Sequence, residues 1–267
     1  MSAWLAPLRE ALDAAPAPVT FFFRDDDAGW RDDRLAALLD VFGRHGVPID
    51  LAAIPLATTP ALATALVARA EAGQPVGVHQ HGYAHLDHQA EGRKCEFGTD
   101  RTYDEQVEDI AAGQRLLRAL IGPSLDPMFT PPWNRCTADT GAALVDLGIG
   151  ALSRDRTAVP LGLEGLPELP VQVDWLAKRK GVPLGRAAVG EQLAARAGEP
   201  APVGVMLHHA EMETEDMTAM DELLDTIRAH ERTRCLSMAA PVTTAPTSSR
   251  TSARSRARDA SRSSRTT

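Results

Sequence analysis

Strand-like apolar runs alternate with helix-like segments along almost the whole chain, and this alternation is the feature that most constrains the fold. Apolar residues three and four apart fill the intervening segments, as in helices that bury one face. Repeated strand–helix units predict a parallel sheet with helices outside it, and seven of them suit a closed or nearly closed barrel in one domain. The predicted strands are 19–24, 48–54, 76–79, 128–130, 149–152, 169–173 and 203–207.

Polar residues gather at or just after the ends of five of these predicted strands. The carboxyl ends of parallel strands meet at one end of a barrel, where catalytic groups lie in such folds. We therefore expect these polar clusters to form a single site. The clusters are 25–27, 79–85, 131–134, 174–175 and 208–209.

Two of the clusters indicate a metal site. His81 and His85 are four residues apart, a spacing that on a helix places both imidazoles on one face. Three consecutive carboxylates, Asp25 to Asp27, repel one another unless a cation or a proton relieves them. Each pattern alone also fits a solvated surface or a helix N-terminus. Together, at strand ends, they favour a metal held by two histidines and one carboxylate, with positions open for water and substrate.

Composition sets the remaining bounds. The hydrophobic fraction of the 267 residues is 44%, enough for a substantial core, and aromatics are only 4%, so that core is mostly aliphatic. The net charge is -8, and residues 250–267 contain six arginines against one aspartate, so the rest of the chain carries about -13, which argues against nucleic-acid binding. Residues 239–267, rich in Ser, Thr, Ala, Pro and Arg, have little to bury and are predicted to be a disordered tail after a single domain at 1–238.

Cysteine usage and the N-terminus suggest a cytoplasmic protein. Cys95, Cys136 and Cys235 include no close pair, so they fit neither a disulfide framework nor a cysteine-based zinc site. The first residues lack the basic and apolar regions of a signal peptide, and no apolar run reaches the length of about 20 residues needed to span a membrane.

Five short motifs, in order across roughly residues 18 to 230, resemble those of the polysaccharide deacetylase family, also called the NodB homology or carbohydrate esterase family 4 domain. Any one of them is weak evidence, but their order, spacing and strand context agree. The motifs are Phe23-Arg24-Asp25-Asp26-Asp27-Ala28-Gly29, His81-Gly82-Tyr83-Ala84-His85, Phe129-Thr130-Pro131-Pro132-Trp133, Val173-Asp174-Trp175 and Met206-Leu207-His208.

This resemblance implies an α/β fold, a distorted (β/α)7 TIM-like barrel of the NodB type. It also implies one divalent metal ion, zinc in the first place with cobalt, nickel, manganese or iron as alternatives. Carried onto this chain, it makes Asp27, His81 and His85 the metal ligands, Asp26 the general base and His208 the general acid.

Further roles follow from the same resemblance. Asp174 would keep His208 cationic and oriented, and Pro132, Trp133 and Trp175 would line the substrate pocket. A backbone N–H near Trp133 would stabilise the oxyanion. The alternative interpretations are core packing for the two tryptophans and a helix N-cap for Asp174.

Two assignments stay open at the level of sequence. The base and ligand pair could be Asp25 and Asp26, although an alanine and a glycine follow the third aspartate, as in related Asp-Asp-x-Gly motifs, which favours Asp26 and Asp27. His209 competes with His208 for the role of general acid.

The chain also departs from the family pattern. Gly82 replaces the usual Ser or Thr, and Thr130 stands where the family often has an arginine that holds the catalytic aspartate. The second change leaves open what tunes Asp26, and both indicate a divergent branch.

The expected activity is metal-dependent hydrolysis of an N-acyl group, usually acetyl, on a small amino sugar, an oligosaccharide or a sugar conjugate. Alternatives are hydrolysis of another carbon–nitrogen amide bond, as in a formamide or cyclic ureide, and iron-dependent oxygen chemistry. A non-catalytic carbohydrate-binding protein is a further alternative, opposed by the retention of all five acid, base and ligand groups. The sequence does not indicate an oligomeric state.

Overall fold

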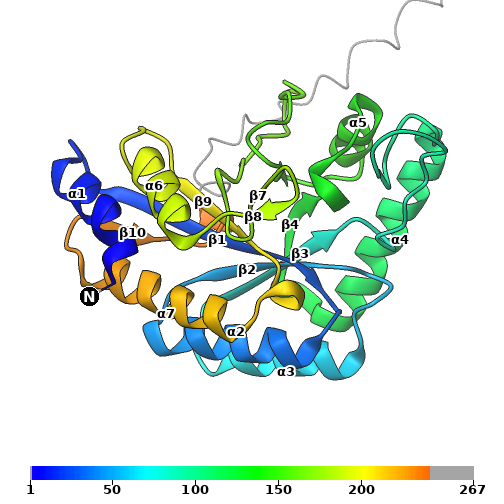
Figure 1. Cartoon of the computed structure of the whole chain (residues 1–267). Coiled ribbons are helices and arrows are strands. Elements are labelled where there is room, and N and C mark those ends of the chain that lie inside the picture. Colours follow the sequence, from blue (N-terminus) through cyan, green and yellow to red (C-terminus); the bar gives the residue numbers. More distant parts are fainter. Residues whose placement is uncertain (1, 241–267) are drawn as a thin grey trace, which may run out of the picture.

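The computed structural model describes residues 2–240, and within them eight strands form one sheet in which every pairing is parallel (Figure 1). Seven strands follow the order β5-β4-β3-β2-β1-β9-β6, and β10 pairs with the start of β1. Their bounds are β1 (Val19–Ala28), β2 (Ile49–Ala53), β3 (Val76–His81), β4 (Leu125–Thr130), β5 (Ala151–Leu152), β6 (Val173–Asp174), β9 (Val203–Leu207) and β10 (Thr233–Cys235).

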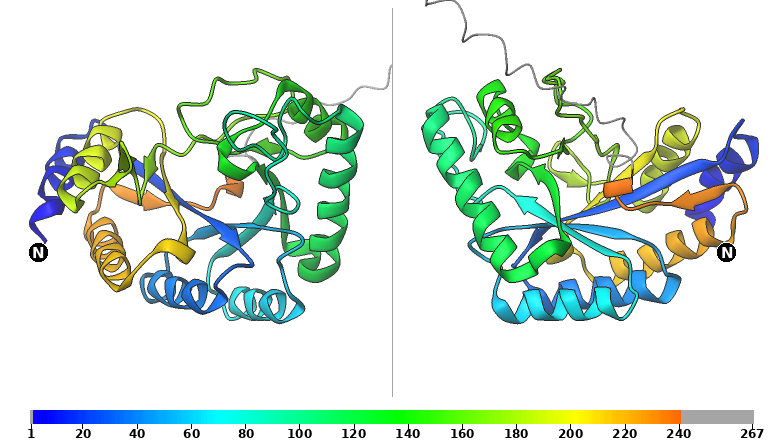
Figure 2. Two further views of the ribbon diagram at one scale, coloured as in Figure 1. Left: turned by 45° about the vertical axis from the view of Figure 1, so that its right-hand side comes forward. Right: turned by 180° about the vertical axis from the view of Figure 1, so that it is seen from behind.

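The helices cover the outer face of this sheet, which curls so that its strands converge (Figure 2). Local sequence signals set several helix ends: Thr102 and Glu105 form a capping box at the start of α4, and Gly46 ends α2 in the left-handed region. The helices are α1 (Ala6–Ala14), α2 (Asp32–His45), α3 (Pro60–Glu71), α4 (Tyr103–Ile121), α5 (Ala138–Asp146), α6 (Arg186–Ala197) and α7 (Thr214–Ala229). Short 3-10 turns are η1 (Ala3–Leu5), η2 (Gly122–Ser124), η3 (Pro132–Asn134) and η4 (His209–Glu211), and β7 (Lys178–Arg179) with β8 (Val182–Pro183) forms a small hairpin.

The expected distorted (β/α)7 barrel is confirmed: seven parallel strands form a curled sheet with outer helices, and β10 adds an eighth strand beside β1. Within residues 2–240 no ladder joins β5 to β6, and isolated bridges from Leu152 to Glu168 and from Asp155 to Val171 lie there instead. The main core lies between the sheet and the helices, where Phe23 packs edge-on against Phe42 at 5.1 Å. Burial of this layer from water stabilises the fold.

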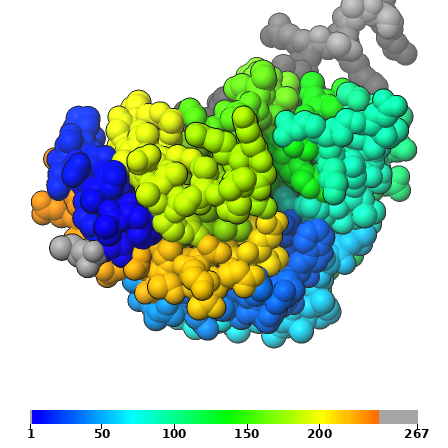
Figure 3. Space-filling model, in the orientation of Figure 1, coloured from blue at the N-terminus to red at the C-terminus, as the bar shows by residue number. Residues whose placement is uncertain are grey.

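The N-terminal helix closes one side of the molecule. Residues of α1 and η1 pack against α6, as the dark blue and yellow-green segments of the space-filling view show (Figure 3). Gly190 of α6 permits this approach, because a Cβ there would collide with the backbone of Trp4. No helix in the described part of the chain has the length and apolar content needed to cross a membrane.

A second, smaller apolar cluster lies on the inner face of the sheet. Phe22, Met206 and Met238 are buried in it, and the backbone N–H of Met238 donates to Asp50 Oδ2 at 2.8 Å. The chain therefore returns to the inside of the sheet before residue 240. Of the tail expected at 239–267, residues 241–267 lie outside the described part; Ala239 packs against this cluster.

Candidate metal and catalytic centre

The three consecutive aspartates at the end of β1 face three different sets of partners. The register of β1 against β2 shifts between Asp25 and Ala28, and Asp27 has a φ of 70° in the left-handed region. Such a bulge re-aims side chains that would otherwise alternate strictly between the two faces of a sheet. The irregular strand end thus separates carboxylates that the sequence presents as a single run.

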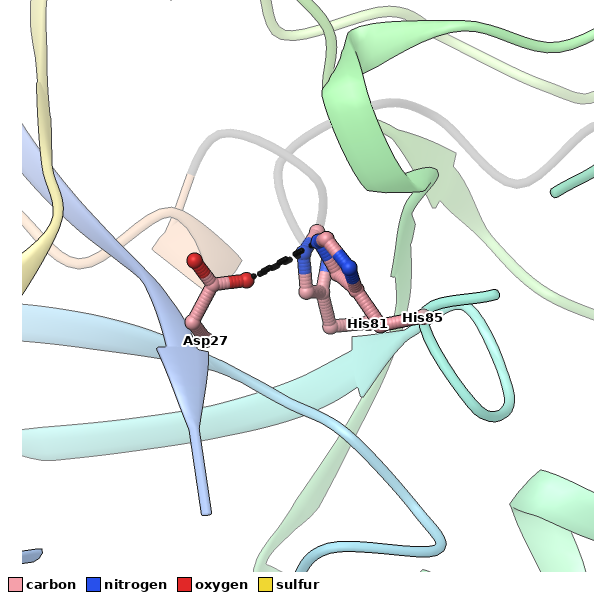
Figure 4. Close-up of side chains that lie close together, drawn as sticks. All are labelled: Asp27, His81 and His85. Carbon is pink, nitrogen blue, oxygen red and sulfur yellow. Dashed lines mark hydrogen bonds and ion pairs between the residues drawn. The ribbon is translucent and has the colours of Figure 1, made fainter. Parts of the chain in front are cut away.

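Asp27 lies against the two histidines of the second motif (Figure 4). Its Oδ1 is 3.2 Å from His81 Nε2 and 3.1 Å from His85 Nε2, and one ligand atom from each residue lies within 4.8 Å of the others. His81 is the last residue of β3, so the two imidazoles do not meet through the spacing of a helical turn. Residues 82–85 form an irregular turn, in which Gly82 has a φ of 56° and His85 a φ of 57°.

The chemistry of these donors fits a divalent cation. His81 Nδ1 lies 3.0 Å from the carbonyl oxygen of Thr130, which can only accept, so Nδ1 carries the proton. In the neutral ring, Nε2 then presents a lone pair to an oxygen of Asp27, and two acceptors meet only if a cation or a proton lies between them. Burial opposes the charge of Asp27, but its contacts with the His81 and His85 rings hold the pKa of this carboxyl far below its usual range.

A buried glutamate shapes the turn that carries His85. Glu96 is fully buried and accepts hydrogen bonds from the backbone N–H groups of Tyr83 at 3.1 Å and Ala84 at 2.7 Å. A Cβ at position 82 would collide with Glu96 and with Pro132, so only glycine fits. The departure at Gly82 is thus explained by packing. Glu96 was not among the predicted site residues, because nothing in the sequence around it points to this turn.

Asp26 is held by an arginine from its own strand. Arg24 donates from Nε to Oδ1 at 2.8 Å and from Nη2 to Oδ2 at 2.9 Å, and both side chains are buried. Residues two apart on a strand share a face, which brings this pair together. Arg24 also donates to Ser153 Oγ and Asn134 Oδ1, each at 2.8 Å. Burial raises the pKa of Asp26, but Arg24 foremost, with His81 and His208, brings it below the ordinary value.

Thr130, at the position where the family often has arginine, contacts histidines instead. Its carbonyl faces His81, and its Oγ1 lies 2.8 Å from His79 Nε2. Burial, reinforced by Arg24, lowers the pKa of His79 to about 3, so this ring is neutral. His79 contacts the centre only through Thr130 and is not among the three clustered ligands.

Asp25 and His209 bind each other, away from the metal ligands. His209 Nδ1 is 2.6 Å from Asp25 Oδ2, its Nε2 is 2.6 Å from the carbonyl oxygen of Trp30, and both side chains are fully buried. Both neighbours accept, so both ring nitrogens donate. Burial opposes the charge, but Asp25 and Trp30 outweigh it and raise the pKa of His209 to about 9. This pair ties the loop after β9 to β1.

His208 is the histidine that faces the centre. Its Nε2 is 3.9 Å from Asp26 Oδ2, and its side chain is 26% exposed, which leaves room for exchange with solvent or substrate. Asp174 accepts a hydrogen bond from the backbone N–H of Leu176 at 3.0 Å, in a turn and not at a helix N-cap. Burial raises the pKa of Asp174 above its usual value, against the Leu176 hydrogen bond and the smaller effect of His208, and no hydrogen bond joins Asp174 to His208 in the described structure.

Two indole rings flank His85. Trp133 lies 4.5 Å from it between ring centres, at a residue with a φ of 55° that follows the buried Pro132. Trp30, which sequence analysis missed, lies 4.8 Å from His85 and is 40% exposed. Both rings come from loops at the carboxyl ends of strands, so the cluster of polar groups at this edge also has aromatic walls.

Trp175 does not join them. Its side chain is 1% exposed and packs against Trp4 at 6.0 Å and the Arg186 guanidinium at 4.3 Å, in the layer between sheet and helices. Of the two interpretations of this residue, the geometry supports core packing.

Comparisons with known proteins locate the fold. No protein-family model matches the chain, and no curated protein matches its sequence. Solved structures do match. A provisionally assigned polysaccharide deacetylase from Mycobacterium smegmatis aligns with a TM-score of 0.62 and 16% identity, over 86% of this chain and 93% of its own. The chain has the fold of carbohydrate esterase family 4.

Other family 4 structures differ in what they do. An acetyl xylan esterase from Clostridium thermocellum, solved with a cobalt ion, aligns with a TM-score of 0.57 and 12% identity, over 84% of this chain and 90% of its own. A pseudoenzyme from Bacillus anthracis aligns with a TM-score of 0.57 and 15% identity, over 85% of this chain and 66% of its own. The family 4 fold therefore hosts active and inactive proteins, so activity depends on the residues of the site and not on the fold.

Proposed function

We propose that this protein is a metal-dependent hydrolase that removes an N-acyl group, in the first place acetyl, from an amino sugar or a sugar conjugate. The observation that carries the proposal is the arrangement of Asp27, His81 and His85 around one point, beside a buried carboxylate, Asp26, that lies within 4 Å of the partly exposed His208. Ligands, base and acid are thus adjacent, as hydrolysis of an amide requires.

Asp27, His81 and His85 would hold the divalent cation, with zinc as the first choice and cobalt, nickel, manganese or iron as alternatives. Such a cation, when bound, lowers the pKa of a water molecule and polarises an acyl carbonyl. Thr130 keeps the proton of His81 on Nδ1 and so leaves Nε2 free to bind.

Asp26 is the proposed general base. The Arg24 fork keeps this carboxylate ionised and fixes its plane, so that an oxygen can accept a proton from the attacking water. His208, across from Asp26, is the proposed acid that protonates the departing amine, which is a poor leaving group as an anion. Asp174 interacts electrostatically with His208, and we assign it the role of orienting that ring.

The aromatic walls favour a sugar as substrate. Trp133 and Trp30 present indole rings next to His85, and flat apolar rings beside polar groups suit a sugar face. The same residues could serve hydrolysis of a formamide or a cyclic ureide, which a substrate panel distinguishes. A non-catalytic sugar-binding protein is the second candidate, because family 4 pseudoenzymes share the fold.

Metal content and turnover test the proposal together. We expect about one equivalent of zinc in the wild-type protein, by elemental analysis after loading, and loss of both zinc and deacetylation of N-acetylated sugars in Asp27→Ala and His81→Ala. Asp26→Asn should retain zinc and lose about 100-fold or more in kcat. His88→Ala, a neighbouring exposed histidine outside the cage, is the matched control and should change neither quantity.

Two outcomes would contradict the proposal. A wild-type protein that binds no metal after reconstitution has no centre of this kind. Normal turnover by Asp26→Asn would remove the base assignment, and zinc binding without hydrolysis of any acylated substrate would leave the sugar-binding protein as the function.

A further inference from the structure

Three cationic side chains, Arg93, Lys94 and Arg135, form a basic cluster beside the candidate metal centre. The Nζ of Lys94 lies 5.8 Å from the centre of the Trp133 ring, and that ring is 4.5 Å from the ring of His85. Arg135 follows Trp133 by two residues and donates from Nη1 to the carbonyl oxygen of Lys94 at 2.7 Å. A single indole ring therefore separates the ammonium of Lys94 from a proposed metal ligand.

The backbone that carries this basic cluster is firmly held. The loop after His85 folds back on itself through hydrogen bonds from the His88 N–H to the Cys95 carbonyl at 3.1 Å and from the Cys95 N–H to Asp87 Oδ1 at 3.0 Å. The Cys95 thiol in turn lies 3.4 Å from the carbonyl oxygen of Arg135. Lys94 and Arg135 thus lie on two segments that are hydrogen-bonded to each other, so binding a ligand there mainly orders side chains.

The positive charge of the basic cluster is not balanced by neighbouring carboxylates. No ion pair joins any of its three side chains to a carboxylate within residues 2–240, whereas a nearby arginine, Arg101, is paired with Asp109. Asp87 is the carboxylate that faces the cluster, and its Oδ1 already accepts from backbone N–H groups. Partial burial and then the charge of Arg93 lower the pKa of Arg135, which agrees with crowded like charges.

We propose that the basic cluster binds an anionic substituent of the substrate, a phosphate or a carboxylate, while the acyl amide lies at the metal centre. The inference rests on the proposed hydrolase function and narrows its substrate class to acidic N-acylated sugars. A guanidinium fork and an ammonium group match phosphate and carboxylate oxygens directly. In a protein with a net charge of -8, such a local positive group also steers anions to this one edge.

Steady-state kinetics of the zinc-loaded enzyme tests the proposal with four probes: N-acetylglucosamine, its 1-phosphate, its 6-phosphate and its C6 uronic acid. At low salt, KM for at least one anionic probe should be about tenfold below that of the neutral sugar, as expected for two charged contacts. Lys94→Ala and Arg135→Ala should remove this preference and leave KM for the neutral sugar unchanged. Arg44→Ala, an exposed arginine on α2, is the control.

Direct binding separates failure of this inference from failure of the proposed function. The full-length protein, stripped of metal with a chelator, should bind the preferred sugar phosphate or uronate in calorimetry, and Lys94→Ala should bind it about fivefold or more weakly. That result would support anion binding by the basic cluster even if no acetamide is hydrolysed. Two results would contradict the role of the basic cluster and leave the proposed hydrolase function standing. One is hydrolysis with equal KM for neutral and anionic probes, and the other is an equal rise in KM for both kinds of probe in Lys94→Ala.

Discussion

At the scale of single residues, the carboxylate proposed as the base is held by an arginine from its own strand. The family often supplies an arginine from the motif that here contains Thr130, but the guanidinium at Asp26 belongs to Arg24. It spans Asp26, Ser153 and Asn134, so it links β1 with the segments after β5 and β4. A charge buried this deeply requires such a full set of partners.

Replacing Arg24 with lysine keeps the charge and removes the fork. Lysine is a point charge that cannot bind both oxygens of Asp26 or reach all of Arg24's acceptors. We expect kcat/KM of Arg24→Lys to fall about 10- to 100-fold while zinc content stays at the wild-type level, since the metal ligands are untouched. Arg44→Lys, in an exposed pair, is the control for the same chemical change. An unchanged kcat/KM would show that Asp26 does not depend on the fork.

At the scale of elements, the turn after β3 decides where the second histidine lies. Gly82 and His85 both adopt positive φ, and Glu96 fixes the two N–H groups between them. The result is two imidazoles facing one carboxylate without a helix. The spacing of His81 and His85 suggests a helical turn, and tertiary contacts with Glu96 and Pro132 override that local tendency.

Alanine substitutions at Gly82, in this turn, and at Gly46, at the end of α2, distinguish backbone strain from a steric collision. Gly82 and Gly46 have nearly the same φ, 56° and 59°, but a Cβ at Gly46 meets nothing within 4 Å. The left-handed backbone alone should lower the free energy of unfolding of both Gly→Ala variants by about 1 kcal/mol, and Gly82→Ala should lose more because its Cβ collides with Glu96 and Pro132. In calorimetry, Gly82→Ala alone should weaken zinc binding, by about 10- to 100-fold, because Glu96 must move. Equal zinc affinity in the two variants would contradict the role of the Glu96 contact.

At the scale of the whole molecule, the inner face of the sheet contains a buried acid that the candidate centre does not use. Asp50 is fully buried, its Oδ1 has no hydrogen-bond partner, and Asp126 lies nearby across Gly77. Burial foremost, with the charge of Asp126, raises the pKa of Asp50 to about 7. The backbone N–H of Met238 makes the one hydrogen bond that opposes this shift.

The raised pKa of Asp50 makes stability depend on pH. Between about pH 4 and about pH 7 the folded protein keeps a proton that the unfolded chain has lost, so stability falls as pH rises through this window, and is then level. The free energy of unfolding falls by about 4 kcal/mol across this window. Asp50→Asn should abolish this component in denaturant unfolding at several pH values and be more stable than wild type at pH 8. Asp225→Asn, an exposed control, should follow the wild-type curve; a similar curve for Asp50→Asn would contradict the prediction.

Much of the fold was determined by the sequence alone. Apolar runs mark seven of the eight parallel strands because a strand covered on both faces is mostly apolar, and the three-residue β10 was not predicted. The rule that polar groups follow strand ends then located Asp26, Asp27, His81, His85 and His208 at one edge. These are local or topological properties, so a pattern of residues suffices to predict them.

Only the tertiary structure decided how those groups pair. Because of the bulge in β1, Asp25 contacts His209, Asp26 contacts Arg24 and Asp27 contacts the two histidines. Three consecutive aspartates in the sequence do not indicate which partner each of them has. Glu96, Trp30 and the basic cluster reach the site through loops whose paths depend on packing across the whole sheet. Pairings between residues far apart in sequence depend on three-dimensional contacts, and for that reason no local pattern predicts them.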